Sequence, residues 1–419
     1  MNRTRPSTRF WLPLGLSCVF SLSAILPAGA QAPAAQSDAP AQTDAAQSDT
    51  QLARATASVL IDNGLAYLKR QQQGDGGWQR TEKEPLGVTS LVLKAFVQQP
   101  TYTSTTDPAK QGFERLLSFQ LEDGGIYKNL LASYNTAIAI STLTAAKDPA
   151  MKERIDRALE YLRTLQWTPE TVSAEDEKIS SDSDPWYGGW GYGGRSRGKG
   201  RPDLSNTQFA IEAMHEAGVK SDDPAMQAAL KFVTRVQNRS ESNDQPWAGN
   251  DGGFAYGPSD ARDGESFAGV YTDTDGKRRL HSMGTMTYAG LKSFIYAGLS
   301  KDDPRVQAAW RWINANWTLD EHPGMSFSGE DKKRNGLFYY YHTLARALRV
   351  YGEPTITTPQ GKTFDWRVEL ISSLAKQQNA DGSWTGTKAY MEDNPIMVTA
   401  YIVLALQEAV ADLNERPVK

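Results

Sequence analysis

A short phrase recurs along the chain: LKRQQQGDGGW at residues 68–78, LLSFQLEDGGIY at 116–127 and LAKQQNADGSW at 374–384. Two stretched copies follow Gln166 (YGGWGYGG, 187–194) and Gln237 (NDGGFAYG, 250–257), and a weak sixth combines Asn316 with HPGMSF at 322–327. Glycine in this phrase supplies the left-handed turn that ends a helix, and glutamine satisfies backbone groups left over there. The large apolar residue that follows packs against the next unit. Such repetition predicts a fold built from repeated units.

Each copy of the phrase lies between two helical patterns of different character. The preceding segment is amphipathic, with stripes such as Ile61, Leu65 and Leu68. Four of these segments open at a proline: Pro108, Pro149, Pro224 and Pro304. The following segment is apolar nearly all round, as in GVTSLVLKAFV at 87–97, and such a helix must be buried on all faces. The pattern predicts an all-α fold, an (α/α)6 toroid of six helical hairpins with an amphipathic outer ring and an apolar inner ring.

The N-terminal residues differ from the rest in composition. Residues 1–30 have a basic start, an apolar stretch and small residues before Ala30, which is typical of a signal peptide; an uncleaved anchor is the alternative. Residues 31–57 are rich in Ala, Gln, Asp and Ser, which predicts a disordered linker. Residues 58–412 then form the single toroid domain, with insertions near 168–202, 239–280 and 318–335. We therefore expect an exported protein, periplasmic or secreted.

Charge and cysteine content exclude several partners and sites. The chain has 45 basic and 49 acidic side chains, and residues 1–30 hold three of the basic ones and no acid, so the exported part carries a net charge of −7. Negative charge argues against nucleic acid as a partner. The only cysteine, Cys18, lies in the signal segment, which excludes disulfides, thiolate zinc sites and a thioester from the exported part. We expect no cofactor and no metal.

The phrase in YLKRQQQGDGGW (67–78) and LAKQQNADGSW resembles the repeated Gln–Trp motif of squalene–hopene cyclases and their relatives, the terpenoid cyclase-type toroids with prenyltransferase/squalene oxidase repeats. The protein prenyltransferases share this α/α-toroid architecture. The resemblance covers about residues 58–410. It implies one toroid of twelve helices with a central cavity, whose mouth lies where the inner helices begin.

RPDLSNTQFAIEAM at 201–214 lies at the start of an expected inner helix. At the matching place the cyclases carry an Asp-x-Asp-Asp-Thr motif, whose middle Asp protonates the substrate. Here Ser205 replaces that acid, and a serine hydroxyl is far too weak to protonate an alkene. Asp203 stays a candidate catalytic residue, and Ser205 and Asn206 are candidate ligand-binding residues, although Asp203 and Ser205 are also good N-cap residues. Whether the chain is an enzyme is open.

FYYYHTLARAL at 338–348 resembles the segment that carries the zinc-binding histidine of protein prenyltransferases, which would be His342. The other two ligands would start the preceding inner helix, where this chain has Met283 and Thr285. One ligand of three does not hold zinc. His281 and His342 start neighbouring inner helices and could approach each other, so both are candidate catalytic residues. A hydrogen-bonded structural histidine is the alternative.

Further candidate ligand-binding residues lie near the expected helix starts or in the loops before them: Tyr134, Asn135, Lys277, Arg279, Tyr341 and Asp393. Lys277 and Arg279 belong to one of three basic clusters, the others at 195–201 and 332–334, that precede consecutive inner helices. Helix N-termini together with Arg and Lys suit an anion. An anionic ligand head at the mouth therefore competes with ordinary solvated loops.

Three functions stay open. The first is an exported toroid that binds an isoprenoid or other hydrophobic molecule, a role compatible with contact at a membrane surface. The second is a glycosidase or lyase, which needs two carboxylates across the cavity ~5–10 Å apart; Glu84, Asp203 and Asp393 are the candidates. The third is a non-catalytic scaffold that binds another protein.

Overall fold

The structure, a computed structural model, describes residues 39–171, 181–193, 200–258 and 267–416. The α-helices of these residues are α1 (Ala39–Arg70), α2 (Gly87–Val97), α3 (Ala109–Leu117), α4 (Ala132–Ala145), α5 (Lys152–Thr164), α6 (Leu204–Glu216), α7 (Pro224–Arg235), α8 (Gly284–Tyr296), α9 (Pro304–Ala315), α10 (Leu337–Tyr351), α11 (Trp366–Ala375) and α12 (Pro395–Glu415). Short 3-10 turns are η1 (Pro149–Met151), η2 (Met325–Ser328), η3 (Glu330–Lys332) and η4 (Ala389–Met391). The chain from Thr43 onward forms one compact unit.

Two small antiparallel hairpins interrupt the mostly helical fold, which the all-α prediction missed. One joins β1 (Val270–Thr272) to β2 (Arg278–Leu280), and the other joins β3 (Thr355–Thr357) to β4 (Thr363–Asp365). β1, β3 and β4 consist mostly of β-branched and aromatic residues, and the two turns contain Gly276 and Gly361, both with positive φ. That combination is a hairpin signal.

The first helix corrects the predicted linker at 31–57 from residue 39 onward, while residues 31–38 lie outside the described residues. α1 runs from Ala39 to Arg70, and Ala53 and Ala57 are buried in the core. Alanine and glutamine, whose abundance suggested a linker, are also strong helix formers, so their low hydrophobicity does not exclude a helix. The expected signal peptide at 1–30 lies outside the described residues.

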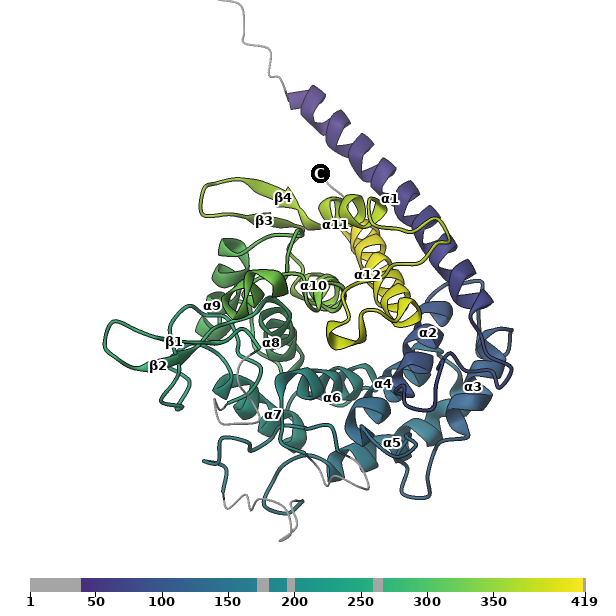
Figure 1. The fold of residues 1–419 in the computed structure, drawn as a ribbon, viewed down its shortest axis with the longest axis horizontal. Helices are drawn as coiled ribbons and strands as arrows, with labels where there is room; N and C mark the ends of the chain where they lie inside the picture. The colour runs from purple at the N-terminus through teal and green to yellow at the C-terminus, as the bar shows by residue number, and fades with distance from the viewer. Residues whose placement is uncertain (1–38, 172–180, 194–199, 259–266, 417–419) are drawn as a thin grey trace, which may run out of the picture. The chain divides into compact units, whose positions relative to one another are not determined.

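Six helices contact one another in a closed sequence: α2 with α4, α4 with α6, α6 with α8, α8 with α10, α10 with α12, and α12 with α2. Figure 1 shows them around a common centre, with α3, α5, α7, α9 and α11 outside them. Ten of the eleven residues of α2 are buried, against four of the nine in α3. The apolar and amphipathic patterns therefore predicted which helices lie inside.

α12 is long and apolar enough to cross a membrane, judged by length and composition. Within the fold, however, 83% of its apolar window is buried. Its residues from Ile396 to Leu406 all belong to the buried interior. α12 is therefore explained as a core helix of the ring.

The recurring phrase makes the same contacts in each well-preserved copy. Gly76 has φ 85°, and the Nε2 of Gln72 donates to the carbonyl of Gly76 and to that of Pro108, both at 2.9 Å. The same bridge to a turn glycine and a neighbouring outer helix recurs at Gln120, Gln166, Gln237 and Gln378. The predicted roles of glycine and glutamine are confirmed, and the phrase joins one unit to the next.

A threonine in the first turn of the ring helices completes this link. Trp78 N donates to Thr89 Oγ1 at 3.0 Å, Trp190 N to Thr207 at 3.0 Å and Trp384 N to Thr399 at 3.1 Å. Thr287 accepts from Phe254 N at 3.1 Å in the same way and also donates to the carbonyl of Met283 in its own helix. In the weak copy, Thr343 Oγ1 donates to the carbonyl of Tyr339, and the loop before α10 carries His322.

Candidate functional site

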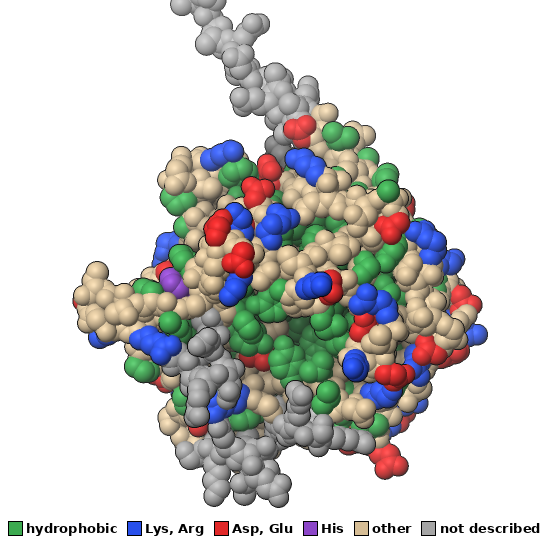
Figure 2. Space-filling model, in the orientation of Figure 1, with side chains coloured by type: hydrophobic (Ala, Val, Ile, Leu, Met, Phe, Trp, Pro, Cys, Tyr) green, Lys and Arg blue, Asp and Glu red, His purple; other side chains and the backbone are tan. Residues whose placement is uncertain are grey.

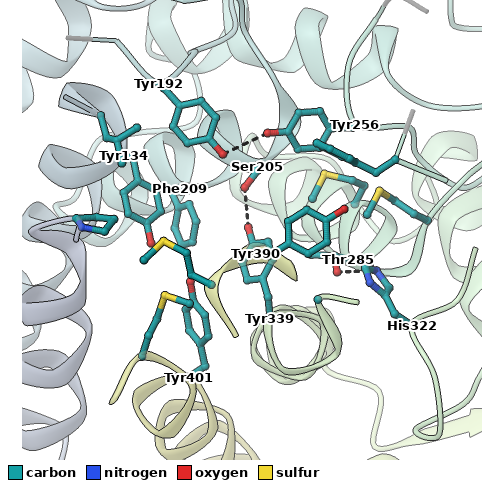
Figure 3. Close-up of a pocket in the computed structure, with 18 residues that line it drawn as sticks. Tyr134, Tyr192, Ser205, Phe209, Tyr256, Thr285, His322, Tyr339, Tyr390 and Tyr401 are labelled. Carbon is teal, nitrogen blue, oxygen red and sulfur yellow. Dashed lines mark hydrogen bonds between the residues drawn. The ribbon is translucent and has the colours of Figure 1, made fainter. Parts of the chain in front are cut away.

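The first turns of the ring helices and the loops before them enclose a cavity of about 220 Å³. Figure 2 shows hydrophobic side chains gathered around a hollow in the middle of this face. Its lining is Pro85, Leu131, Tyr134, Tyr192, Ser205, Phe209, Tyr256, Phe267, Met283, Thr285, Met286, His322, Gly336, Tyr339, Tyr390, Met391, Met397 and Tyr401 (Figure 3). Eight are tyrosine or phenylalanine and four are methionine. Among these described residues, none is Asp, Glu, Lys or Arg.

Four side chains of the lining are exposed large hydrophobic residues. Tyr192, Phe267, Tyr390 and Met391 are 42%, 40%, 41% and 36% exposed. The Phe267 ring meets Tyr256 edge to face at 4.6 Å and Tyr390 at 5.5 Å. Aromatic rings in this arrangement attract one another beyond the area they bury. The cavity therefore opens through an apolar mouth.

A chain of hydrogen bonds runs from a buried lysine to the cavity wall. Lys292 Nζ donates to Gln208 Oε1 at 2.5 Å, and Gln208 Nε2 donates to the hydroxyl of Tyr339 at 3.2 Å. The Tyr339 hydroxyl lies 2.9 Å from Ser205 Oγ (Figure 3). Because an ammonium only donates, the amide of Gln208 has a fixed orientation.

A second polar point of the lining is Thr285 with His322 (Figure 3). The backbone N–H of Thr285 donates to His322 Nε2 at 3.1 Å, which makes this nitrogen an acceptor. Nδ1 therefore carries the proton and donates to the carbonyl of Asn335 at 2.8 Å, while the Thr285 hydroxyl donates to Nε2 at 2.8 Å. Burial lowers the pKa of His322 to about 4, so the ring is neutral. His322 was not among the sequence candidates.

Asp203 is buried behind the wall and is not part of the lining. It is the N-cap of α6: its carboxylate accepts from Asn206 N at 2.8 Å and from Asn206 Nδ2 at 2.7 Å. Burial raises the pKa of Asp203 to about 7, although these hydrogen bonds act in the opposite direction. The N-cap interpretation therefore holds for Asp203, whereas Ser205 lies in the cavity lining.

Of the other ligand-binding candidates, Tyr134 and Ser205 line the cavity. Asn135 Oδ1 accepts from Gly87 N at 2.8 Å, which links two ring helices. The Tyr341 hydroxyl donates to the carbonyl of Leu319. Asp393 is exposed, and its neighbour Asn394 is the residue that caps α12. These contacts are structural.

The two predicted catalytic histidines lie apart from the lining. His281 packs between Tyr271 and Phe327, with ring centroids at 4.5 and 4.0 Å. His342 stacks on Tyr401 at 5.0 Å, and burial lowers the pKa of His342 to about 4. The two rings have different partners, since His281 follows the strand β2 whereas His342 belongs to α10. The expected approach of the two rings is therefore not supported.

None of the described residues of the basic clusters lines the cavity. Arg279 donates to Asp273 Oδ2 at 2.7 Å and to backbone carbonyls, Lys277 is exposed in the β1–β2 turn, and Lys333 pairs with Glu330. Residues 194–199 of the first cluster lie outside the described residues. In the described part of the chain, no group of three or more His, Cys, Asp or Glu side chains is placed to hold a metal ion.

Below the cavity, charged side chains fill the centre of the ring. Arg346 of α10 pairs with Glu216 at 2.7 Å and Glu408 at 2.9 Å, while Glu212 of α6 contacts both Lys292 and, at 3.5 Å, Lys94. Burial opposes ionisation of Glu212, but Lys292, Lys94 and Arg346 outweigh it and hold its pKa well below the ordinary value. The sequence analysis missed this ionic cluster.

Glu392 was missed as well, one position before the predicted Asp393. It is fully buried, and its Oε1 accepts from Phe338 N at 2.8 Å and Tyr339 N at 2.9 Å at the start of α10. Its Oε2 has no hydrogen-bond partner among the described residues. Burial raises the pKa of Glu392 to about 7. Glu392 therefore fixes the segment carrying Tyr390 and Met391 to α10.

No model of a known protein family matches the chain, and no curated protein matches it. Solved structures of the type II terpene cyclase MstE from Scytonema do. A variant in complex with geranylgeranyl dihydroxybenzoate, its substrate, has a TM-score of 0.53 and 15% identity over 87% of this chain and 100% of that one. The apo form has a TM-score of 0.52 and 14% identity over 86% and 99%. A glycosidase has a TM-score of 0.46 and 12% identity over 86% and 98%. The chain has a terpene cyclase-like fold, as the Gln–Trp phrase predicted.

Proposed function

We propose that this protein is an exported, squalene-cyclase-like toroid of six helical hairpins that binds an isoprenoid or other hydrophobic small molecule in its cavity. The closed contacts of the ring helices support the six-hairpin arrangement, with α1 as the sixth outer helix. One observation carries the binding proposal: the lining is aromatic and methionine-rich, and its described residues include no charged side chain. Such a surface favours an apolar ligand. Export rests on the composition of residues 1–30.

The size of the cavity sets a scale for the ligand. A cavity of ~150 Å³ lined by apolar residues binds benzene, so about 220 Å³ corresponds in proportion to roughly nine or ten carbon atoms. A longer chain would extend through the mouth, over Tyr390 and Met391. The exposed apolar rim also suits delivery of such a ligand from a membrane surface.

The structural neighbour supports the same class of ligand. MstE is a terpene cyclase whose structure holds a geranylgeranyl aromatic compound. In this chain the place of the cyclase acid is taken by Ser205, and Asp203 is held by Asn206 behind the wall. Binding without standard acid-initiated cyclisation is therefore our proposal.

Glycan cleavage has less support from the same site. It needs two carboxylates that face each other across a cleft. Of the three carboxylates considered, Glu84 is bound by Arg80 at 2.7 Å, Asp203 caps α6, and Asp393 is exposed. None of them lines the cavity.

A matched pair of variants tests the binding proposal. Tyr390 lines the cavity and is 41% exposed, whereas Tyr271 is 39% exposed and does not line it. We expect Tyr390→Ala to weaken binding of geraniol roughly fivefold to tenfold through lost apolar contact, measured by titration calorimetry, and Tyr271→Ala to change it by less than about twofold. Equal effects of the two variants, or no binding by the unmodified protein, would contradict the proposal.

A further inference from the structure

The direction of each hydrogen bond in the Lys292 chain follows from its first member. Lys292 donates to Gln208 Oε1, so the Gln208 amide group must donate to Tyr339. The Tyr339 oxygen then accepts from Gln208. The bond between Tyr339 and Ser205 uses one of their two hydroxyl protons, whichever residue donates it. One O–H of this pair is left over, and both residues line the cavity.

Thr285, which forms the other polar pair of the lining with His322, offers the cavity a hydrogen-bond acceptor and not a donor. His322 Nε2 accepts a hydrogen bond from the Thr285 hydroxyl, because its Nδ1–H is directed to Asn335. Thr285 therefore offers oxygen lone pairs and no proton to the cavity. The donor that a ligand meets on the α6 and α10 side is the Ser205–Tyr339 pair.

The ionic cluster strengthens that donor without placing a charge in the cavity. Lys292 is buried and forms an ion pair with Glu212, so its positive charge is neutralised below the cavity wall. A donor chain that starts at an ammonium group is polarised toward its free end. An anion would have to lose its hydration against a lining without a cation, which is unfavourable.

We propose that the Ser205–Tyr339 pair, oriented by Lys292 through Gln208, is the specificity determinant of the cavity and selects an isoprenoid with a neutral oxygen that accepts a hydrogen bond. This inference rests on the proposed binding function and names the ligand class: an alcohol, ether or carbonyl compound in preference to a hydrocarbon or a diphosphate.

Gln208→Glu reverses the direction of the hydrogen bond between residue 208 and Tyr339, with almost no change in the size of the side chain. A carboxylate only accepts, so Glu at this position takes a bond from Lys292 and another from the Tyr339 hydroxyl. Ser205 then donates to Tyr339, and no O–H is left for a ligand. We expect the affinity ratio of geranyl methyl ether to the hydrocarbon 2,6-dimethyl-2,6-octadiene to fall about tenfold relative to the unmodified protein, since one hydrogen bond to the ligand is lost.

Other variants separate this role from a structural one. Ser205→Ala leaves the Tyr339 hydroxyl proton available to a ligand, so this variant is expected to keep the affinity ratio. The double variant Ser205→Ala with Tyr339→Phe removes both hydroxyls and is expected to lower the ratio as Gln208→Glu does. Tyr271→Phe, which removes the hydroxyl of an exposed tyrosine outside the lining, is the control and is expected to keep it.

Calorimetric titration of each variant with both compounds gives a clear decision. If neither compound binds the unmodified protein, the proposed function fails. If both compounds bind, but Gln208→Glu and the double variant each change the affinity for the ether and for the hydrocarbon by the same factor, the binding function stands and the selectivity inference is overturned. A preference of the unmodified protein for geranyl diphosphate over the ether would overturn it too.

Discussion

The two halves of the ring interior use the same helices for opposite purposes. In α6, Ser205 and Phe209 line the cavity, and two turns later Glu212 and Glu216 enter the ionic cluster. α8 repeats this division, with Met286 above and Lys292 below. The upper half is uncharged, aromatic and open, while the lower half is closed by paired charges. The cavity is therefore bounded at its far end by polar residues, although the ring helices are otherwise apolar.

The largest effect is expected from breaking the closed half. Glu212 faces Lys94, Lys292 and Arg346, and its side chain is only 9% exposed. Glu212→Ala leaves three cations without this partner, which we expect to lower the free energy of unfolding by about 3–5 kcal/mol. Urea unfolding followed by circular dichroism measures it.

An exposed pair is the control for that variant. Lys152 and Asp156 lie 2.7 Å apart, but their side chains are 76% and 55% exposed. Asp156→Ala should change stability by less than about 0.5 kcal/mol. If Glu212→Ala were as mild as Asp156→Ala, the cluster would not be what closes the ring.

The next effect is pH-dependent and belongs to the cavity half. Burial raises the pKa of Glu392 from 4.5 to about 7, so the folded state holds its proton more tightly than the unfolded state does. Stability is therefore lost as the pH rises from about 4.5 to about 7. Glu392→Gln cannot ionise, and we expect it to match the unmodified protein at pH 4 and to exceed it by about 3 kcal/mol at pH 8.

Unfolding curves of both proteins at several pH values test this sign. The amide oxygen of Gln can still accept from Phe338 and Tyr339, so the attachment to α10 is kept. A difference that is largest at pH 4, or one that does not change with pH, would contradict the buried ionisation of Glu392.

The smallest effect is expected at the hairpin that the anion hypothesis emphasised. Lys277 is exposed in the β1–β2 turn and does not line the cavity. Lys277→Ala should change stability by less than about 0.5 kcal/mol and leave geraniol binding within about twofold of the unmodified protein. A loss of tenfold or more would return the basic clusters to the binding site.

Local patterns were sufficient to predict the ring. The contacts of the recurring phrase are local: Gln72, Gly76 and Trp78 lie in one turn and bond within it or to the adjoining helix. Their spacing in the sequence is therefore enough to predict these contacts. The linker was misjudged because alanine and glutamine serve helices and flexible segments equally well. The strand hairpins lie between helices, and each strand is only three residues long, too short for an alternating pattern to stand out.

The site was predicted in part because its chemistry depends on distant pairs. Tyr134 and Ser205 were found from their place at helix starts. Gln208 and Tyr339 gain their role only when α6 meets α10, which no local pattern shows. One signal was present in the sequence. Lys94, Glu212 and Lys292 each lie five residues after the threonine that recurs near the start of the ring helices, and they place opposite charges in otherwise apolar segments. Glu392 had no comparable signal.

Native mass spectrometry of the protein purified from its native source, followed by organic extraction, tests the central claim most directly. We expect a bound species with the mass of the protein plus one neutral, oxygen-containing isoprenoid, which is absent from a Tyr390→Ala preparation or strongly reduced in it. A protein recovered empty, which also takes up neither geraniol nor its methyl ether, would contradict a ligand-binding cavity.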